Sequence, residues 1–294
     1  MIKTDEQIFT KTILTELRKY GLTGKLALEA TPVFAEWYKN DRYNKNDNSF
    51  AIILASQKGE IGRIASLNLQ YHKDPKVKWV VAGNPDADKE ALQNLSKAPD
   101  FLAVRTGKTE AGRFDPYHWD DTYNEAKKRF TYVSRKTSFL VSYRQAIAGN
   151  PGAKGAVLSA IARKGEYLDI LLDNPALTAP VLRTIVQTGY KKEFFAYRKD
   201  QIFKKCAQHK LMTPNLLLLT AKNSGYDRQI MQDIIKHPNA DDRVYDLFVS
   251  SPYSDLRLMA AKIPALPTKF VNKLMNDRNI GVRMAANDLA LGVR

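Results

Sequence analysis

A phrase that ends in proline recurs along this chain and limits its possible folds more than any other feature. In each copy, small or apolar residues lead up to the proline, and apolar residues follow it at offsets of seven and ten. The prolines are Pro85, Pro151, Pro175, Pro238 and Pro264. The apolar pairs that follow them are Leu92 and Leu95, Leu158 and Ile161, Leu182 and Ile185, Tyr245 and Phe248, and Val271 and Leu274. A two-part pattern that recurs in this way indicates a repeat protein.

Each copy predicts two short helices joined by a turn. Before the proline, apolar residues recur four or five positions apart, as they do on one face of a helix. Proline lacks an amide hydrogen and disfavours helical geometry in the residue before it, so we expect the first helix to end there. Asp and Asn residues follow, and both are good N-caps for a second helix. Because one helix pair cannot bury its apolar face alone, the sequence predicts an all-α fold, an α-solenoid of short helix–Pro turn–helix repeats.

The intervals between copies show where the repeat is regular and where it is interrupted. The interval from Pro151 to Pro175 is close to that from Pro238 to Pro264, whereas the interval from Pro85 to Pro151 is more than twice as long. Between Pro175 and Pro238, the segment 211–216 matches 177–182, which places His209 at the position of Pro175. We therefore expect one more unit there, with an insertion of about ten residues.

The repeat resembles the variant leucine-rich repeat and the wider HEAT-like class, in which Asn-Pro and a Val-Arg-x-Ala-Ala type of phrase accompany the apolar pairs. The best match is the segment 277–287, and the period of about 24–26 residues is typical of the variant leucine-rich type. The resemblance covers about residues 70–294, apart from 100–140, where no repeat unit can be recognised. It implies a right-handed, mostly helical superhelix in which Arg144, Arg257 and Arg283 belong to internal Asp–Arg ladders. It implies no activity.

Two domains are expected. Residues 1–70 lack the repeat phrase and are predicted to form an irregular helical N-terminal cap, because terminal units must shield the stack. Residues 71–294 are predicted to form the HEAT-like or variant leucine-rich repeat solenoid, with an irregular insertion at about 100–140.

Local signals within the N-terminal region predict its helices. A capping-box pattern at Thr4 and Gln7 predicts a first helix that ends at Gly21. Thr31 and Pro32 predict the start of a second helix, as N-cap and first helical residue. The polar run 39–48 predicts a long loop, and two apolar segments follow it at 50–55 and 61–69.

Composition favours an anionic partner. The formal net charge is +15, and residues 101–210 alone hold 20 basic and 10 acidic residues. A bias of this size is typical of proteins that bind nucleic acid, an acidic protein or a membrane surface, although it also serves solubility alone. No apolar stretch approaches the length of a membrane span, roughly 18 residues, so a membrane partner is not expected.

The cysteine content and the amino-acid composition indicate the cellular compartment and the kind of genome that encodes the chain. The single Cys206 excludes an intramolecular disulfide and is expected to be a buried thiol in a reducing, cytoplasmic compartment. The abundance of Lys, Asn and Tyr fits an AT-rich genome, such as those of some phages whose proteins act in a host cell.

Two stretches interleave basic and aromatic residues, 127–136 and 190–199, and the second continues to Lys205. Basic side chains can neutralise phosphates and aromatic rings can stack on bases. The alternative is an amphipathic helix with Phe194, Phe195 and Phe203 in the core and the lysines in solvent. The predicted nucleic-acid-binding residues are Lys127, Lys128, Arg129, Arg135, Lys136, Lys191, Lys192, Arg198, Lys199, Lys204 and Lys205.

Catalytic and cofactor motifs are weak. Thr106-Gly107-Lys108-Thr109 resembles the end of a P-loop, but Leu102 stands where the motif needs its first glycine. The histidines His72, His118, His209 and His237 lack metal-ligand spacing. His118-Trp119-Asp120-Asp121 is similar in composition to HEAT-like alkylpurine DNA glycosylases, whereas the structural alternative is an Asp N-cap before a helix over 122–130. We therefore predict no catalytic residues, no metal and no cofactor.

The sequence favours a non-enzymatic basic α-solenoid that binds a polyanion on its curved face. Nucleic acid is the most favoured polyanion. The alternative is a protein–protein adaptor or assembly scaffold, with an acidic protein as partner. A second alternative is a HEAT-like DNA glycosylase. The oligomeric state is left open.

Overall fold

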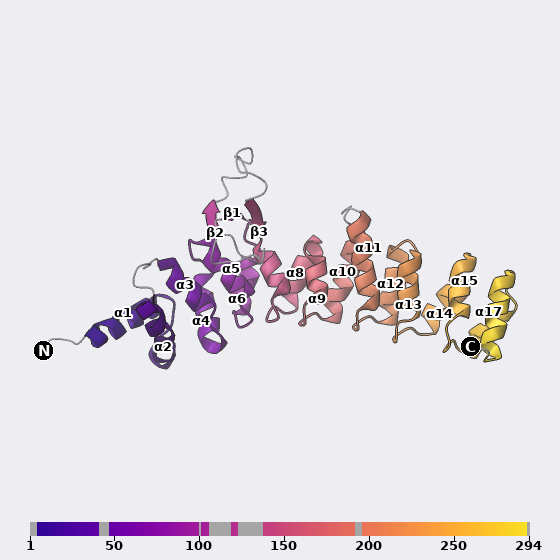
Figure 1. Ribbon diagram of the computed structural model, residues 1–294, viewed down its shortest axis with the longest axis horizontal. Helices are drawn as coiled ribbons and strands as arrows, with labels where there is room; N and C mark the ends of the chain where they lie inside the picture. The colour runs from indigo at the N-terminus through magenta and orange to yellow at the C-terminus, as the bar shows by residue number, and fades with distance from the viewer. Residues whose placement is uncertain are drawn as a thin grey trace. The chain divides into compact units, whose positions relative to one another are not determined.

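The computed structural model describes residues 5–40, 47–99, 101–105, 119–122, 138–191 and 196–292 of the 294-residue chain. These residues are mostly helical, which confirms the predicted helical class. They belong to two compact units, residues 1–161 with 174–176 and residues 162–173 with 177–294. Figure 1 shows the helices in chain order.

The first unit begins with two helices that pack on each other, α1 (Asp5–Lys19) and α2 (Gly24–Asn40). The helices α3 (Asp47–Ala55), α5 (Pro75–Gly83) and α7 (Tyr143–Gly149) then form one row, in which each packs on the next. A second row holds α4 (Gly59–Leu69) and α6 (Lys89–Leu95). The helix α8 (Ala156–Lys164) starts in this unit, and its last residues belong to the other.

The second unit repeats this two-row arrangement. One row consists of α9 (Leu168–Asp173), α11 (Ala196–Gln208), α13 (Arg228–Ile235), α15 (Ser254–Ala261) and α17 (Ile280–Ala290), each packed on the next. The other row consists of α10 (Ala179–Lys191), α12 (Pro214–Asn223), α14 (Asp242–Val249) and α16 (Thr268–Met275). Each repeat thus gives one helix to each row, as the proline phrase predicted.

Two kinds of connection alternate along the repeats. A proline turn joins the first helix of a repeat to the second, as at 236–241 between α13 and α14. A return loop joins the second helix to the first helix of the next repeat, as at 224–227 between α12 and α13. In the second unit the return loops lie along the upper edge of Figure 1 and the proline turns along the lower edge.

The predicted core positions are buried, except that of Tyr245. The pairs Leu92 and Leu95, Leu158 and Ile161, and Leu182 and Ile185 are all at most 2% exposed, and Phe248, Val271 and Leu274 are buried as well. Tyr245 is half-buried, with its ring centroid 6.1 Å from that of Phe270. Cys206 is buried, as the sequence predicted, and burial raises the pKa of its thiol to about 12, which keeps the thiol unreactive.

An asparagine ladder explains why Asn precedes proline in the first unit. Asn150 donates from Nδ2 to the carbonyl oxygens of Ala82 and Asn84, both at 2.8 Å, and its Oδ1 accepts from the amide of Gly152. Asn174 makes the same three contacts one repeat later, with Ala148, Asn150 and Ala176. Each buried side-chain amide therefore donates to two carbonyls at the end of the first helix of the preceding repeat. One carbonyl of each pair, that of Asn84 or Asn150, also accepts a backbone amide of its own turn, that of Ala87 or Ala153.

The ladder begins before the region that carries the sequence phrase. Asn84 donates to the carbonyl oxygens of Ala55 and Gln57, each at 2.7 Å. Gln57 thus occupies the place that Asn84 and Asn150 occupy in later repeats. The domain boundary at residue 70 stays a prediction, but hydrogen bonds of the repeat type already join α3 to α5.

Histidines replace asparagine in the ladder of the second unit. The ring nitrogen Nδ1 of His237 accepts from the amide of Asn239, and Nε2 lies 3.3 Å from the carbonyl oxygen of His209. Nδ1 of His209 likewise accepts from the amide of Leu211. The predicted register of this repeat was wrong by one residue, because α10 starts at Ala179 and α12 at Pro214, so that His209 matches Asn174.

The N-terminal region departs from two predictions. Thr31 and Pro32 do not start a helix but lie inside α2, whose first residue is Gly24. The hydroxyl of Thr31 donates to the carbonyl oxygen of Ala27 at 2.7 Å, within the helix rather than at its N-terminus. The predicted loop 39–48 is shorter, because α2 extends to Asn40 and α3 starts at Asp47. The side chain of Thr4 lies outside the described residues.

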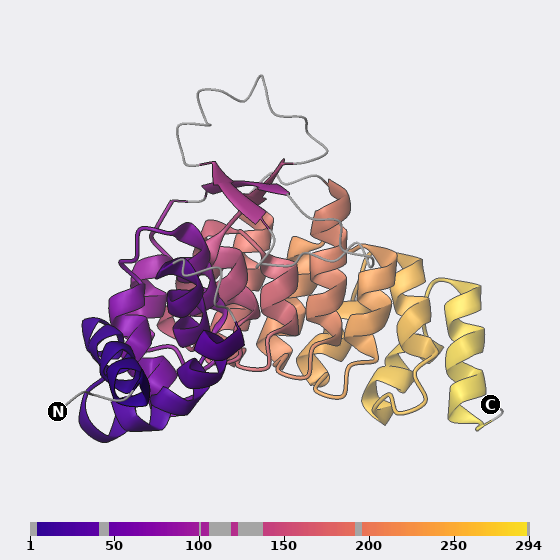
Figure 2. The ribbon, with the colours of Figure 1, turned by 60° about the vertical axis from the view of Figure 1, so that its left-hand side comes forward.

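The insertion at 100–140 contains a small sheet, so the all-helical expectation does not extend to it. The strands are β1 (Phe101–Arg105), β2 (Trp119–Thr122) and β3 (Ser138–Val141), with β1 in the centre and both pairs antiparallel (Figure 2). In the register, Asp120 lies opposite Val104 and Asp121 opposite Ala103. Asp120 and Asp121 are therefore strand residues and not the predicted helix N-cap. Aromatic and β-branched residues in β1 and β3 favour the extended backbone.

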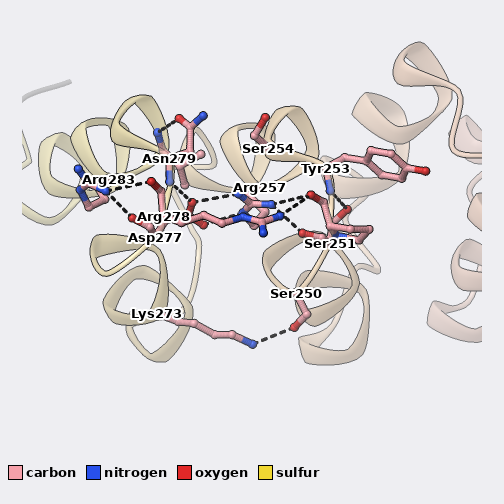
Figure 3. A network of polar contacts seen from close by, with 12 residues as sticks. Ser250, Ser251, Tyr253, Ser254, Arg257, Lys273, Asp277, Arg278, Asn279 and Arg283 are labelled. Atoms are coloured by element: carbon pink, nitrogen blue, oxygen red, sulfur yellow. Dashed lines mark hydrogen bonds and ion pairs between the residues drawn. The ribbon is translucent and has the colours of Figure 1, made fainter.

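A buried ion pair joins the last two return loops of the second unit. Nε of Arg257 lies 2.6 Å from one carboxylate oxygen of Asp277, and Nη2 lies 3.1 Å from the other. Nη1 of Arg257 donates to the carbonyl oxygens of Ser251 and Pro252 (Figure 3). Arg144 donates to the backbone carbonyl of Ala98, and Arg283 donates to that of Asp277. The Asp–Arg pairing that the resemblance implied is thus present at Arg257, and all three arginines hold loops in place.

Candidate nucleic-acid interface

The insertion predicted near residue 200 lengthens one helical hairpin at the return-loop edge. Both α10 and α11 have 13 residues, whereas the other helices that start in the described second unit have 6 to 11. The extra residues lie at the end of α10 and the start of α11, because Ala179 and Gln208 match the helix ends of other repeats. The N-terminal end of α11 therefore extends past its neighbours in Figures 1 and 2.

Three of the predicted binding residues in this hairpin lie at its extended end. Lys191 is the last residue of α10, and Arg198 and Lys199 lie in the first turn of α11. Lys204 and Lys205 lie further along α11 and are exposed, and Nζ of Lys205 lies 2.7 Å from a carboxylate oxygen of Asp173. Of the alternative core residues, Phe203 is fully buried.

Other predicted binding residues lie outside the described ranges. They are Lys127, Lys128, Arg129, Arg135, Lys136 and Lys192, and the P-loop-like segment 106–109 and His118 lie outside as well. The topology still places the first five between β2 and β3, within the connection from α6 to α7. This connection runs from a second helix to the next first helix, as does the connection from α10 to α11 at the extended hairpin.

Exposed lysines also lie on the opposite edge of the repeats. Lys210, Lys236 and Lys262 flank the proline turns of the second unit, are exposed, and form no ion pair with a described residue. Positive charge by itself therefore does not distinguish the two edges.

Aromatic residues distinguish the return loops from the proline turns. Tyr167, Tyr226 and Tyr253 lie in three return loops of the second unit, and the side chains of Tyr226 and Tyr253 are 41% and 61% exposed. The proline turns 209–213, 236–241 and 262–267 contain no Phe, Tyr or Trp. In the first unit, Tyr71 precedes α5 in a return loop and is 72% exposed. This pattern was not predicted from the sequence, because the tyrosines stand at different offsets from the prolines.

Two arginines accompany these tyrosines. Arg228 begins α13 directly after the loop of Tyr226, and its side chain is exposed. Arg278 lies in the last return loop and donates from Nη2 to the carbonyl oxygen of Pro252 at 3.0 Å, which holds it beside the loop of Tyr253. The side chain of Tyr253 points away from the Arg257 network in Figure 3. This part of the edge therefore combines exposed rings with exposed guanidinium groups.

The described residues contain no metal-binding chemistry and no membrane span. No cluster of three His, Cys, Asp or Glu side chains in the described ranges could hold a metal ion. None of the described helices combines the length and the apolar surface needed to cross a bilayer. The glycosylase hypothesis stays a prediction, because the side chains of Asp120 and Asp121 lie outside what the structure describes.

Comparisons with known proteins identified no relative of this chain. The chain matches no protein-family model, no curated protein and no solved structure.

Proposed function

We propose that this chain is a basic α-solenoid that binds a polyanion, with nucleic acid as its ligand, and that the binding is not coupled to catalysis. The observation that carries the proposal is the position of the basic stretches. Residues 101–210 hold 20 basic and 10 acidic residues. The first interleaved stretch falls in the connection from α6 to α7, and the second spans the end of α10, the connection that follows and the start of α11. Lysines placed beyond the packed helices can reach phosphates without disturbing the core.

The solenoid part of the proposal rests on repeated packing within each unit. Helices of one row pack on one another at each step, and buried Asn or His side chains join successive repeats through backbone carbonyls. Repeats that contact only their neighbours generate extended surfaces suited to long ligands. We place the contact on the return loops rather than on a curved face.

The test removes charge from the extended hairpin. The combined variant Lys191→Ala, Lys192→Ala, Lys199→Ala and Lys204→Ala should weaken binding to nucleic acid. It should also reduce the slope of log affinity against log salt, by about 0.7–0.9 for each phosphate that is no longer neutralised. Fluorescence anisotropy at several salt concentrations measures both quantities.

A charge-matched control lies on the proline turns. Lys154, Lys210, Lys236 and Lys262 are exposed there, so their combined change to Ala removes the same charge from proline turns instead of the hairpin. We expect this control to reduce affinity much less. If the wild-type chain shows no salt-dependent binding to any nucleic acid at low ionic strength, the proposal is wrong.

A protein–protein adaptor is the second candidate, and a stripe on α17 favours it. Ile280 and Met284 lie on one face of the helix, and Leu291 directly follows its last residue; they are 66%, 61% and 75% exposed. Exposed apolar stripes of this kind are typical of protein contacts. If the chain is an adaptor, Ile280→Ser with Met284→Ser should abolish complex formation with a protein partner and leave binding to nucleic acid unchanged, as measured by light scattering and anisotropy.

A further inference from the structure

We infer that the return loops of the second unit form a stacking site for single-stranded nucleic acid, built from Tyr226, Tyr253, Arg228 and Arg278. We call these four residues the tyrosine edge. The inference rests on the proposed function and specifies its ligand as unpaired strands, whose bases are free to stack on rings.

The two rings lie in successive return loops and are available for contact. Tyr226 precedes α13 and Tyr253 precedes α15, and these two helices pack on each other. Neither ring contacts another ring or a cation among the described residues, although both are large apolar groups at 41% and 61% exposure. Exposed aromatic rings in neighbouring repeats can take successive bases of one strand, since every base has a stacking face.

The backbone at Tyr226 gives an independent reason to assign it a role. The helix α12 ends in a Schellman motif, in which Gly225 donates to the carbonyl of Lys222 and Tyr226 donates to that of Ala221. Gly225 and Tyr226 both have left-handed backbones, with φ of 66° and 62°. Glycine tolerates this region, but a bulky aromatic residue is strained there.

The same strain occurs at a second return loop. Tyr167 has φ of 54° and follows Gly165, whose φ is 70°. These are the two described non-glycine residues with positive φ, and both are tyrosines in return loops. Strained residues of this kind concentrate at binding sites, where the function of the side chain offsets the strain.

The charges of the edge suit phosphates. The guanidinium groups of Arg228 and Arg278 are exposed, and the carboxylates adjacent to them in the sequence, Asp227 and Asp277, are already engaged. As the N-cap of α13, Asp227 accepts hydrogen bonds from the amides of Gln229 and Ile230. Asp277 forms an ion pair with the buried Arg257. Arginine can pair with phosphate through two hydrogen bonds and can also stack on bases.

The experiment compares ring removal with ring conservation in the full chain. The probes are a labelled single strand of about twelve thymidines and a labelled hairpin duplex of similar length. We expect Tyr226→Ala with Tyr253→Ala to weaken single-strand binding about 25-fold or more, at about fivefold or more per ring. Tyr226→Phe with Tyr253→Phe keeps both rings and should stay within about twofold of wild type.

A second readout maps the contact directly. Photocrosslinking of a single strand that contains iodinated uracil should join it to peptides with Tyr226 or Tyr253, as identified by mass spectrometry. Crosslinks confined to other peptides would overturn the inference. Thermal unfolding of each variant shows that a loss of binding does not come from a loss of fold.

The outcomes separate this inference from the proposed function. If the double Ala variant binds the single strand as wild type does, or if wild type prefers the duplex, the tyrosine edge is wrong and polyanion binding by the lysines stands. If wild type binds neither probe at low salt, both are wrong. Lys236→Ala with Lys262→Ala, on the proline turns, serves as the control for charge and should leave single-strand binding within about twofold.

Discussion

The guanidinium of Arg257 binds the carboxylate of Asp277 through two hydrogen bonds, of 2.6 Å and 3.1 Å, and both side chains are buried. Arg257 comes from α15 and Asp277 from the loop before α17, so the pair fixes successive repeats to each other. Arg257 holds the pKa of Asp277 below its ordinary value, chiefly through these hydrogen bonds. Its Nη1 binds two carbonyls of the preceding return loop, so each guanidinium nitrogen has an acceptor.

Removing one partner of this pair should be costly. Asp277→Ala leaves a buried guanidinium without its counter-ion, and we expect a loss of about 3–5 kcal/mol in the free energy of unfolding. Denaturant unfolding measures it. Asp241→Ala is the control, because Asp241 pairs with Arg243 on the surface, although it also caps α14, so we expect about 1 kcal/mol. Equal losses in both variants would contradict the structural role of Asp277.

Each asparagine of the ladder should contribute strongly to the free energy of unfolding. Asn150→Ala leaves the carbonyl of Ala82 and the amide of Gly152 without the partner that Asn150 provides, and it removes one of two donors to the carbonyl of Asn84. Buried groups left unpaired cost about 1–3 kcal/mol each, so a loss of at least about 2 kcal/mol is expected in chemical denaturation. Asn276→Ala removes an exposed amide that donates to Asn272, and a change of under about 0.5 kcal/mol is expected.

Gly152 follows the ladder and lies too close to the preceding repeat for a side chain. A Cβ at this position would overlap the carbonyl oxygen of Pro85, although the backbone there is not left-handed. Gly152→Ala should therefore lower the midpoint of thermal unfolding, because the backbone of one of two repeats must shift. Gly83→Ala is the matched control, since a Cβ there meets nothing within 4 Å. We expect it to be neutral or to stabilise by up to about 1 kcal/mol, as Ala does in helices.

Two histidines should make the folded state sensitive to acid. Partial burial lowers the pKa of both His72 and His209 from the ordinary value of 6.5, and the Nδ1 atom of each accepts a backbone amide, of Asp74 and Leu211. As the pH falls below about 6.5, the unfolded chain takes up protons that the folded chain resists. The free energy of unfolding should therefore fall progressively until the pH reaches the lowered pKa values.

Asparagine tests this pH dependence without removing the hydrogen bonds. Asn84 and Asn150 show that an Asn side chain can accept the amide two residues later, which is what Nδ1 does at both histidines. His72→Asn with His209→Asn should keep most of the stability at pH 7.5 and flatten its decline toward pH 5. A decline as steep as in wild type would assign the acid sensitivity to other groups.

The repeated phrase by itself determined the helix pairs and their buried faces. Proline ends the first helix through its own covalent structure, and the offsets of seven and ten follow from helical periodicity. Leu182 and Phe248 could therefore be assigned to the core without any coordinates, and the fully buried Cys206 as well. These are local properties, so they can be predicted from the sequence wherever the phrase is intact.

Tertiary structure decided the rest, because the relevant partners are distant in the sequence. Nothing in the local pattern tells that Gln57 takes the place of an asparagine, since this depends on the side chain of Asn84 in the next repeat. The start of α2 at Gly24 rather than at Thr31 was likewise visible only in the structure. The common position of Tyr226 and Tyr253 was hidden for a related reason. Their offsets from the prolines differ, and they share an edge only because the two rows of helices bring every return loop to the same side of the unit.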